Sequence, residues 1–343
     1  TKVLVHQHLA SGKLRLDDTL AKFELGFKPA IASKITVEHL LNHQSGFQDI
    51  FTAEYTADQL SFDTIDKKLG LLRDEPLLFE PGTDRKYSNY GYIVLGAIME
   101  KVNQSSFESL LQTNIFNRSG MSNASLHPNF TDKNQSIRYS YLYNGKIKKV
   151  GVTEHASPDG GSEASTKEIQ QFYRALFYSD KLLNPKSPVV RQAFNMDGKH
   201  WGAYGGGTGV SSAVEVDLVN GYEIVVLANT DSLVAENISG RIYQFITTGA
   251  YNEIRPRPEN FTYDYFVKNG NTSLQKHFKQ EYKDRGYKQF IGRTINSLGL
   301  ELLDAQNTKH AFDIFSYLAY LFPTSHQVYD SLAYYHLRTG NKG

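Results

Sequence analysis

The sequence predicts an α/β (α+β) fold in which an antiparallel sheet is flanked by helices, beside a mainly helical half and a small C-terminal helical appendage. Residues 212–219 and 222–228 are two strands joined by an Asn-Gly turn, which supplies the positive φ angles of a tight hairpin. The first strand alternates apolar and polar residues, and the second is apolar enough to be buried on both faces. An apolar helix pattern over 90–102 and a helical pattern throughout the region beyond Pro256 and Pro258 complete the prediction.

Composition and charge narrow the class of protein. The chain has 343 residues, and its 37 Lys and Arg residues against 36 Asp and Glu residues give a formal net charge of +1, which argues against a general nucleic-acid binder. The longest nearly apolar run, residues 92–99, is far shorter than the ~20 residues of a membrane-spanning helix, so we expect no membrane span in this chain. The absence of cysteine excludes a disulfide framework, a thiolate zinc site and a cysteine nucleophile.

Helix signals mark the first half of the chain. Residues 1–9 open the chain inside a helix, and residues 34–43 carry a shorter helical signal. The helix over 90–102 follows a turn, with Ser88 or Asn89 as its N-cap.

The second half adds a hairpin and a capped helix. Residues 139–150 predict a hairpin that turns at Asn144-Gly145. Ser165 and Glu168 match a capping box that opens a helix over 169–177.

Two closely spaced prolines predict a domain boundary. We expect a main domain over 1–250, a linker over 251–262 and a helical extension over 263–343. Apolar residues of the extension fall at the offsets of a tetratricopeptide unit, and the triplet at 297–299 is echoed at 331–333, 34 positions later. The extension therefore resembles one and a half tetratricopeptide repeats, which could contact a protein partner; an ordinary helical hairpin is the alternative.

Several motifs of enzymes and metal sites are missing. The sequence has no G-x-S-x-G elbow, no H-E-x-x-H and no P-loop. His39 and His43 are four residues apart, as zinc ligands on one helix face would be, but no acidic residue lies between them and no third ligand is identifiable. We therefore expect no metal here, and a structural role for both imidazoles.

The triplet Tyr87-Ser88-Asn89 is the sharpest candidate for catalysis. Tyr87 precedes a helix, so the positive end of the helix dipole favours its phenolate, while the Asn89 amide can orient a substrate. Because tyrosine and asparagine are common in turns, the triplet takes its weight from the motifs around it.

Five motifs follow one another along residues 1–250. They are LRLDDT at 14–19, ITVEHLLNHQSG at 35–46, FEPGTDRKYSNYGY at 79–92, FNRSGM at 116–121 and GGGTGVSS at 205–212. In this order they resemble the serine β-lactamase and penicillin-binding-protein-like family, and more narrowly its class C and esterase branch.

The resemblance implies acyl-serine chemistry without metal or cofactor. In the family, the serine of a Ser-x-x-Lys motif attacks a carbonyl, and the Lys and the tyrosine of Tyr-x-Asn move the proton. The Tyr-x-Asn match is Tyr87 and Asn89. The strand that borders the site matches Tyr204, Gly205 and Gly206, and the backbone N–H of Gly207 would be an oxyanion donor.

A second match concerns the wall of the site. Asp159 and Gly160 resemble the family's loop before the capped helix, which commonly contacts substrate. A turn that simply needs glycine is an equally good interpretation.

The nucleophile motif departs from the family pattern. The resemblance places the Lys of Ser-x-x-Lys about three residues before Thr1, so we expect the attacking serine upstream of this chain. A match at Ser273-Leu-Gln-Lys276 lies beyond the linker, in the wrong order, and Ser273 is interpreted as a helix cap.

Tyr204 is a second departure, because the family usually has Lys or His there. A neutral phenol cannot supply the positive charge that would fix a substrate carboxylate and lower the pKa of the neighbouring base. The substitution favours uncharged esters or amides over β-lactams and peptidoglycan stems, which carry a carboxylate.

We therefore expect a serine hydrolase that acts on a small ester or amide, or on a peptidoglycan-like substrate. The resemblance alone implies an extracytoplasmic location, periplasmic or secreted, in a bacterium. The alternative is a catalytically silent family member that uses the family's active-site cleft and the C-terminal repeats to bind a partner. Tyr204 and the missing nucleophile favour this alternative.

Overall fold

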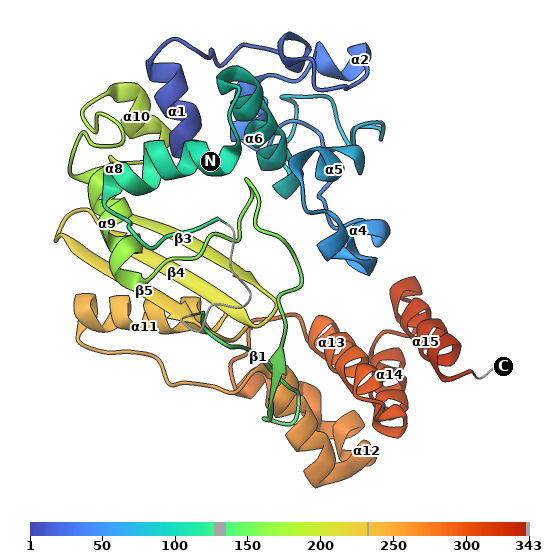
Figure 1. Cartoon of the computed structure of the whole chain (residues 1–343). Coiled ribbons are helices and arrows are strands. Elements are labelled where there is room, and N and C mark those ends of the chain that lie inside the picture. Colours follow the sequence, from blue (N-terminus) through green and yellow to red (C-terminus); the bar gives the residue numbers. More distant parts are fainter. Residues whose placement is uncertain (127–134, 232, 341–343) are drawn as a thin grey trace.

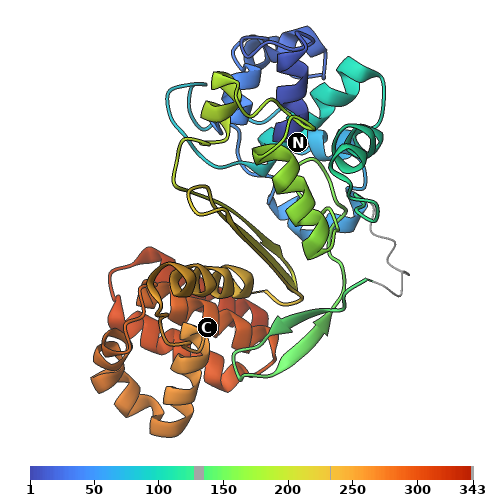
Figure 2. The same ribbon diagram turned by 90° about the vertical axis from the view of Figure 1, so that its left-hand side faces the viewer.

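The structure is a computed structural model, and it describes residues 1–126, 135–231 and 233–340. A helical half lies at one end of the molecule, a sheet in the middle and a group of C-terminal helices at the other end (Figure 1). The view turned by 90° shows the same order (Figure 2). The predicted fold class, an antiparallel sheet with flanking helices, a helical half and a helical appendage, is confirmed.

Short helices and turns build the helical half. Hydroxyl side chains cap the start of α3 to α7 by accepting a backbone N–H, which satisfies a donor that has no partner inside the helix. These caps are Thr36, Thr52, Thr64, Ser88 and Ser106. The elements are α1 (Lys2–Ala10), η1 (Leu20–Phe23), α2 (Pro29–Ala32), α3 (Val37–Leu41), α4 (Ala53–Ala57), η2 (Gln59–Ser61), α5 (Ile65–Gly70), α6 (Asn89–Asn103), α7 (Phe107–Leu111), η3 (Gln112–Phe116) and α8 (Asn117–Ser119).

The helix α6 lies at the centre of the first hydrophobic core. Its residues Ile93, Val94 and Leu95 are fully buried, and the core extends from α1 to Val214 and Val216 in the sheet. The helical half and the sheet therefore share one core, which fixes the start of α6 relative to the sheet. In the described part of the chain, no helix combines the length and the apolar content that crossing a membrane requires.

The main sheet has three antiparallel strands in the order β3 (His200–Gly207), β4 (Val210–Asp217) and β5 (Tyr222–Ala228). The helices α9 (Thr166–Phe177) and α11 (Val234–Thr248) pack against it, and α10 (Pro188–Ala193) precedes β3. The predicted capping box of α9 is confirmed, since Ser165 and Glu168 each bond the other's backbone N–H.

The expected burial of the two predicted strands is wrong. We expected alternation in the first strand and full burial in the second, but β4 is buried over most of its length and β5 is partly exposed. The reason is the strand order, because β4 is central and β5 lies at an edge. A separate hairpin of β1 (Arg138–Tyr141) and β2 (Ile147–Val150) confirms the hairpin predicted over 139–150.

Four helices form the C-terminal region and a second core. They are α12 (Pro258–Asp284), α13 (Ile291–Asp304), α14 (Thr308–Leu321) and α15 (His326–Thr339). The expected linker over 251–262 is too long, since Pro258 is the first residue of α12, a position where proline's missing N–H costs nothing. Gly270 (φ +74°, ψ 175°) divides α12 into two helices, and Ser273 follows it by three residues. The Ser273 hydroxyl bonds the Tyr265 hydroxyl at 3.0 Å and not a backbone N–H, so its interpretation as a helix cap is wrong. The resemblance to tetratricopeptide repeats stays a prediction.

The hairpin β1–β2 connects the two regions. Tyr143, at its tip, is buried in the second core against Tyr263. Asn260 of α12 donates to the carbonyl of Leu142 at 2.8 Å. At the other end of the hairpin, the N–H of Tyr139 donates to the carbonyl of Asn229, which directly follows β5, at 3.0 Å. The C-terminal helices are therefore attached to the sheet through this hairpin.

Candidate active site

The predicted pair Tyr87 and Asn89 lies at the start of α6. Ser88 is the N-cap and has an extended backbone; Tyr87 precedes it, and Asn89 is the first residue of α6. The Tyr87 hydroxyl donates to Asn89 Oδ1 at 3.1 Å. Tyr87 is 58% exposed, so its side chain is accessible from solvent.

The loop over 43–50 holds the start of α6 in place. Its Gly46 has a φ of +79°, and a β-carbon there would lie 2.3 Å from the carbonyl oxygen of Phe79, so only glycine fits. His43 Nδ1 accepts from the N–H of Ser88 at 3.3 Å, and the Ser88 hydroxyl donates to the carbonyl of Gln48 at 2.9 Å. The sequence His-x-x-Gly is thus part of the support that holds Tyr87 and Asn89 in place.

Asp49, in the same loop, contacts Asn89 twice. Its Oδ1 accepts from the backbone N–H of Asn89 at 2.8 Å, and its Oδ2 accepts from Asn89 Nδ2 at 3.1 Å. The sequence analysis missed this residue, although it stands three positions after Gly46, the last residue of a motif that it did identify.

The expected preference of Tyr87 for the phenolate is wrong. Partial burial and the negative charges of Asp49 and Asp159 raise the pKa of the Tyr87 hydroxyl above its usual value. The helix dipole that the sequence analysis invoked acts in the opposite direction and is confined to the first turn. Tyr87 is therefore a neutral phenol at physiological pH.

Asp159 and Gly160 lie on a tight turn beside this pair. The backbones of Ser157 and Gly160 bond each other in both directions, at 2.9 and 3.0 Å. Gly161 has a φ of +90°, and a β-carbon there would lie 2.8 Å from Ala156 Cα, so the turn itself requires a glycine. Thr1 donates its hydroxyl to the carbonyl of Pro158, which brings the start of α1 to the same turn.

A buried lysine supports this turn. Lys68 of α5 is 1% exposed and donates to the carbonyl of His155 at 3.0 Å and to the Ser157 hydroxyl at 2.8 Å. Ser157 in turn donates to Asp159 Oδ1. Burial raises the pKa of Asp159, and the charge of Lys68 opposes that rise. The sequence analysis missed Lys68, because nothing in the local sequence distinguishes it from the exposed lysine beside it.

The predicted oxyanion strand ends near this turn. Glu154 accepts from the Tyr55 hydroxyl at 3.0 Å, and a β-carbon added at Gly207 would lie 3.8 Å from Glu154 Oε1. Gly205 and Gly206 precede Gly207 on β3, whose outer edge carries no other strand of the three-stranded sheet. An open strand edge of this kind can present N–H groups to a substrate.

The structure separates Tyr204 from Tyr87. The Tyr204 hydroxyl donates to the carboxylate of Glu215 at 2.9 and 3.0 Å, and Glu215 also contacts Ser239 of α11 and His200. Partial burial and Glu215 raise the pKa of Tyr204 to about 12. The phenol therefore lies on the α11 face of the sheet.

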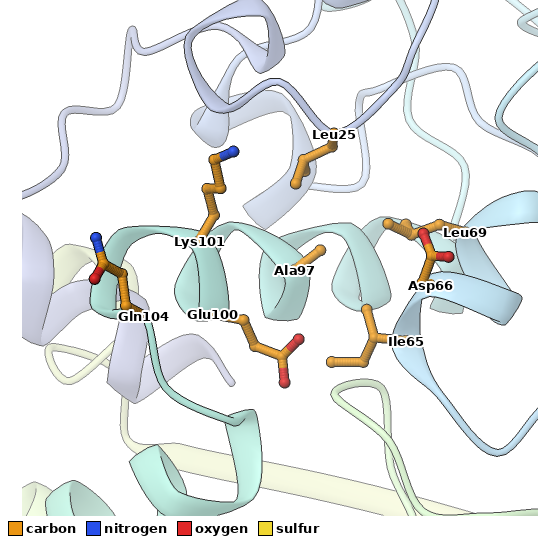
Figure 3. A pocket seen from close by; sticks show the side chains of 8 residues that line it. All are labelled: Leu25, Ile65, Asp66, Leu69, Ala97, Glu100, Lys101 and Gln104. Atoms are coloured by element: carbon orange, nitrogen blue, oxygen red, sulfur yellow. The ribbon is translucent and has the colours of Figure 1, made fainter.

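Two shallow hollows of about 380 Å³ each lie near these elements. One is lined by Tyr204, Gly205, Gly206 and Gly207, on the predicted strand. The other lies along α6 and is lined by none of the predicted site residues (Figure 3). Its lining contains Glu100, which accepts the backbone N–H of Phe107, the first residue of α7.

The two histidines have the expected structural role. His39 Nδ1 accepts the N–H of Thr36 in a capping box, and His43 lies beyond the end of α3 with a positive φ. The two imidazoles therefore do not share a helix face. Among the described residues, no group of three or more His, Asp or Glu side chains could hold a metal ion.

The site thus brings together Tyr87, Asn89 and the turn that carries Asp159, while Gly207 lies by Glu154 of the segment that leads into this turn. A neutral phenol that donates to an amide oxygen can pass a proton to a leaving group. Free backbone N–H groups at a strand edge can stabilise an oxyanion. This arrangement fits acyl transfer.

The comparison with known families agrees with this fold. Residues 1–248 match the Beta-lactamase family, and the protein belongs to that family. The match ends at the last residue of α11, so the C-terminal helices lie outside it.

Curated relatives have related names. Penicillin-binding protein 4* of Bacillus subtilis (strain 168) is 32% identical over 170 residues, which cover 43% of this chain and 36% of that protein. Penicillin-binding protein 4 of Amycolatopsis lactamdurans is 30% identical over 143 residues, which cover 40% of this chain and 35% of that protein. The chain thus matches about a third of the length of these relatives.

Solved structures share the fold. The penicillin-binding protein from Bacillus halodurans has a TM-score of 0.59 and 23% identity, covering 67% of this chain and 79% of that one. The octameric penicillin-binding protein homologue from Pyrococcus abyssi has a TM-score of 0.63 and 18% identity, covering 78% and 68%. At these identities the likeness concerns the fold.

Proposed function

We propose that the natural protein is an acyl-serine hydrolase of esters or amides, with its nucleophile in a Ser-x-x-Lys motif that precedes Thr1. The observation that carries the proposal is the exposed Tyr87 hydroxyl, bonded to Asn89 at the start of a rigid helix in a chain of the Beta-lactamase family. The pair corresponds to the Tyr-x-Asn that the family resemblance implies.

In the proposed reaction, the serine oxygen attacks the substrate carbonyl carbon while its proton moves to the Lys. The oxyanion that forms accepts from the N–H of Gly207. When the tetrahedral intermediate collapses, the leaving group takes a proton from the Tyr87 hydroxyl, which regains one from the Lys. Water then attacks the acyl-serine carbonyl and gives a proton to the Lys and Tyr87 pair. The serine oxygen takes a proton back from this pair, and the acid is released. The neutral state of Tyr87 suits a proton donor.

The substrate class is proposed from relatives and from Tyr204. Solved structures with this fold are titled a D-stereospecific amidohydrolase, a D-amino acid amidase and a hydrolase with promiscuous acyltransferase activity. Curated relatives include putative D-alanyl-D-alanine carboxypeptidases. Because Tyr204 brings no positive charge, we favour uncharged esters and amides over carboxylate-bearing substrates.

One observation favours a second candidate, a catalytically silent binding protein. Glu215 holds the Tyr204 hydroxyl on the α11 face, where it cannot replace the family's cation beside the nucleophile. In this case the cleft and the C-terminal helices would bind a partner. An extracytoplasmic location and the likeness of these helices to tetratricopeptide repeats remain part of the proposal under either function.

The proposal is tested by Tyr87→Phe in the full-length natural protein. We expect turnover of an amide, whose amine leaving group needs a proton, to fall by about 10²–10⁴-fold, the usual contribution of a positioned proton donor. Tyr178→Phe, at an exposed tyrosine that follows α9, is the matched control and leaves turnover unchanged. Full activity in Tyr87→Phe would exclude the role assigned to Tyr87.

A further inference from the structure

Asp49 occupies an unusual position at the start of α6. Its carboxylate accepts three hydrogen bonds, from the backbone N–H groups of Ile50 and Asn89, each at 2.8 Å, and from Asn89 Nδ2 at 3.1 Å. A residue that only capped the helix would need the backbone contact alone. The third contact is made with the side chain of Asn89, a residue of the candidate active site.

The hydrogen bond from Asn89 Nδ2 to Asp49 determines the orientation of the Asn89 amide. A carboxylate accepts hydrogen bonds and does not donate them, so the NH₂ group of Asn89 must point at Asp49. The amide oxygen then points at the Tyr87 hydroxyl, 3.1 Å away, and that hydroxyl must donate. One negative charge thus fixes the direction of two successive hydrogen bonds.

Resting on the proposed function, we propose that Asp49 is the positioning residue of the site: its carboxylate orients the Asn89 amide and, through it, the proton of Tyr87. The second hydrogen of Asn89 Nδ2 remains available to a substrate carbonyl. The lone pairs of the Tyr87 oxygen remain available to receive a proton. Without Asp49, the amide can turn over and present NH₂ to Tyr87, which reverses the bond.

Other groups also face Tyr87 and must be separated from Asp49 in a test. The His43 ring packs against Tyr87 at a tilt of 33°, with centroids 4.5 Å apart. The charge of Asp159 contributes to the raised pKa of Tyr87. Arg85 lies two positions before Tyr87, and its charge contributes to lowering the pKa of His43. Of these groups, Asp49 alone contacts Asn89.

Two substitutions separate the charge of Asp49 from its geometry. Asp49→Asn keeps the shape and removes the charge, whereas Asp49→Glu keeps the charge and displaces it by one methylene. With tyrosines labelled with ¹³C at Cζ, NMR follows the titration of Tyr87, whose signal is assigned by its loss in Tyr87→Phe. We expect the pKa of Tyr87 to fall in Asp49→Asn and to stay close to that of the natural protein in Asp49→Glu.

Acylation of the full-length protein gives the second readout. We expect both substitutions to slow acylation by on the order of 10²-fold, because Asp49→Asn lets the Asn89 amide turn over and Asp49→Glu displaces the carboxylate by about 1 Å. The control Asp84→Asn, at an exposed carboxylate that bonds only the N–H of Arg85, leaves both readouts unchanged. The pH at which the acylation rate changes follows the Tyr87 titration in each variant.

The outcomes distinguish this inference from the proposed function. An unchanged Tyr87 titration in a folded Asp49→Asn protein overturns the positioning role, whatever the activity. If the natural protein is not acylated at all, the proposed function fails, while the NMR titration still decides whether Asp49 controls Tyr87. If Asp49→Asn does not fold, Asp49→Glu provides the test. An acylation rate in Asp49→Glu equal to that of the natural protein overturns the inference.

Discussion

Lys68→Met is the substitution whose effect follows most directly from the contacts around the candidate site. Methionine keeps most of the buried stem of Lys68 but removes its ammonium group. The carbonyl of His155 and the Ser157 hydroxyl then each lose a donor, and Asp159 loses the positive charge nearest to it. The turn beside Tyr87 is therefore expected to loosen.

The magnitude depends on the charge left behind. Removing one partner of a buried ion pair costs about 3–5 kcal/mol. Here Ser157 stands between the two charges and continues to donate to Asp159, so we expect the lower figure of about 2–3 kcal/mol at pH 8. The exposed neighbour Lys67 bonds Asp63 on the surface, and Lys67→Met is expected to cost less than about 1 kcal/mol.

The cost of Lys68→Met must also depend on pH. Burial already raises the folded-state pKa of Asp159 above its unfolded value of about 3.9, and loss of Lys68 raises it further. A raised folded pKa gives stability that is fully present below the unfolded pKa and is lost as pH rises through the folded pKa. The destabilisation is therefore smallest at about pH 4, where only the two hydrogen bonds are missing, and largest at pH 8.

Urea unfolding at both pH values measures this difference. The single tryptophan, Trp201, packs against Tyr173 and Phe177 in the first core, to which Leu69 of α5 also belongs, so its fluorescence reports on unfolding of that core. The same loss of stability at both pH values, or a loss no larger than that of Lys67→Met, would refute the assignment of Lys68 as the counter-charge of this turn.

Three further substitutions test other parts of the structure. Ser165→Ala removes one half of the capping box of α9 and should cost about 1 kcal/mol, measured by urea unfolding; no loss would show that the box is not formed in solution. Gly46→Ala meets both a positive φ and a backbone oxygen 2.3 Å away, so we expect a loss of at least about 2 kcal/mol in the same assay, and a near-neutral result would contradict the loop geometry. Tyr143→Ala should increase hydrogen exchange in α12, whose Tyr263 packs on that ring, while α6 keeps its protection; unchanged exchange in α12 would contradict the proposed attachment.

Local signals in the sequence were sufficient for the elements that begin or turn at a characteristic residue. Ser88 and Ser165 cap helices as predicted, because a short hydroxyl side chain satisfies a free N–H wherever a helix starts. The Asn-Gly turn of the β1–β2 hairpin follows from the same local chemistry, since Gly145 has a φ of +75°.

Features that depend on distant residues were not predictable in the same way. The burial of β4 and β5 depends on which strand is central, and both strands are apolar enough for either place. Lys68 becomes buried because residues 155–159 fold over α5, almost ninety positions later in the chain. The raised pKa of Tyr87 comes from partial burial and from the charges of Asp49 and Asp159, and no spacing rule connects these two residues to Tyr87.

The residues of the candidate site show the same difference between local and distant signals. Tyr87 and Asn89 were found because they stand in a motif, and the structure joins them by a hydrogen bond. Tyr204 also stands in a motif, but its hydroxyl turns to Glu215, a residue of the neighbouring strand that the motif does not include. A motif match therefore located the backbone of β3 without determining where this side chain points.

The central claim, acyl-serine chemistry, is tested most directly by the intact mass of the naturally expressed full-length protein before and after exposure to a serine-reactive acylating probe, with peptide mapping of any adduct. The account predicts a single adduct on a serine of a Ser-x-x-Lys motif that precedes Thr1. A folded protein that gains no adduct would contradict it and would favour the silent binding protein.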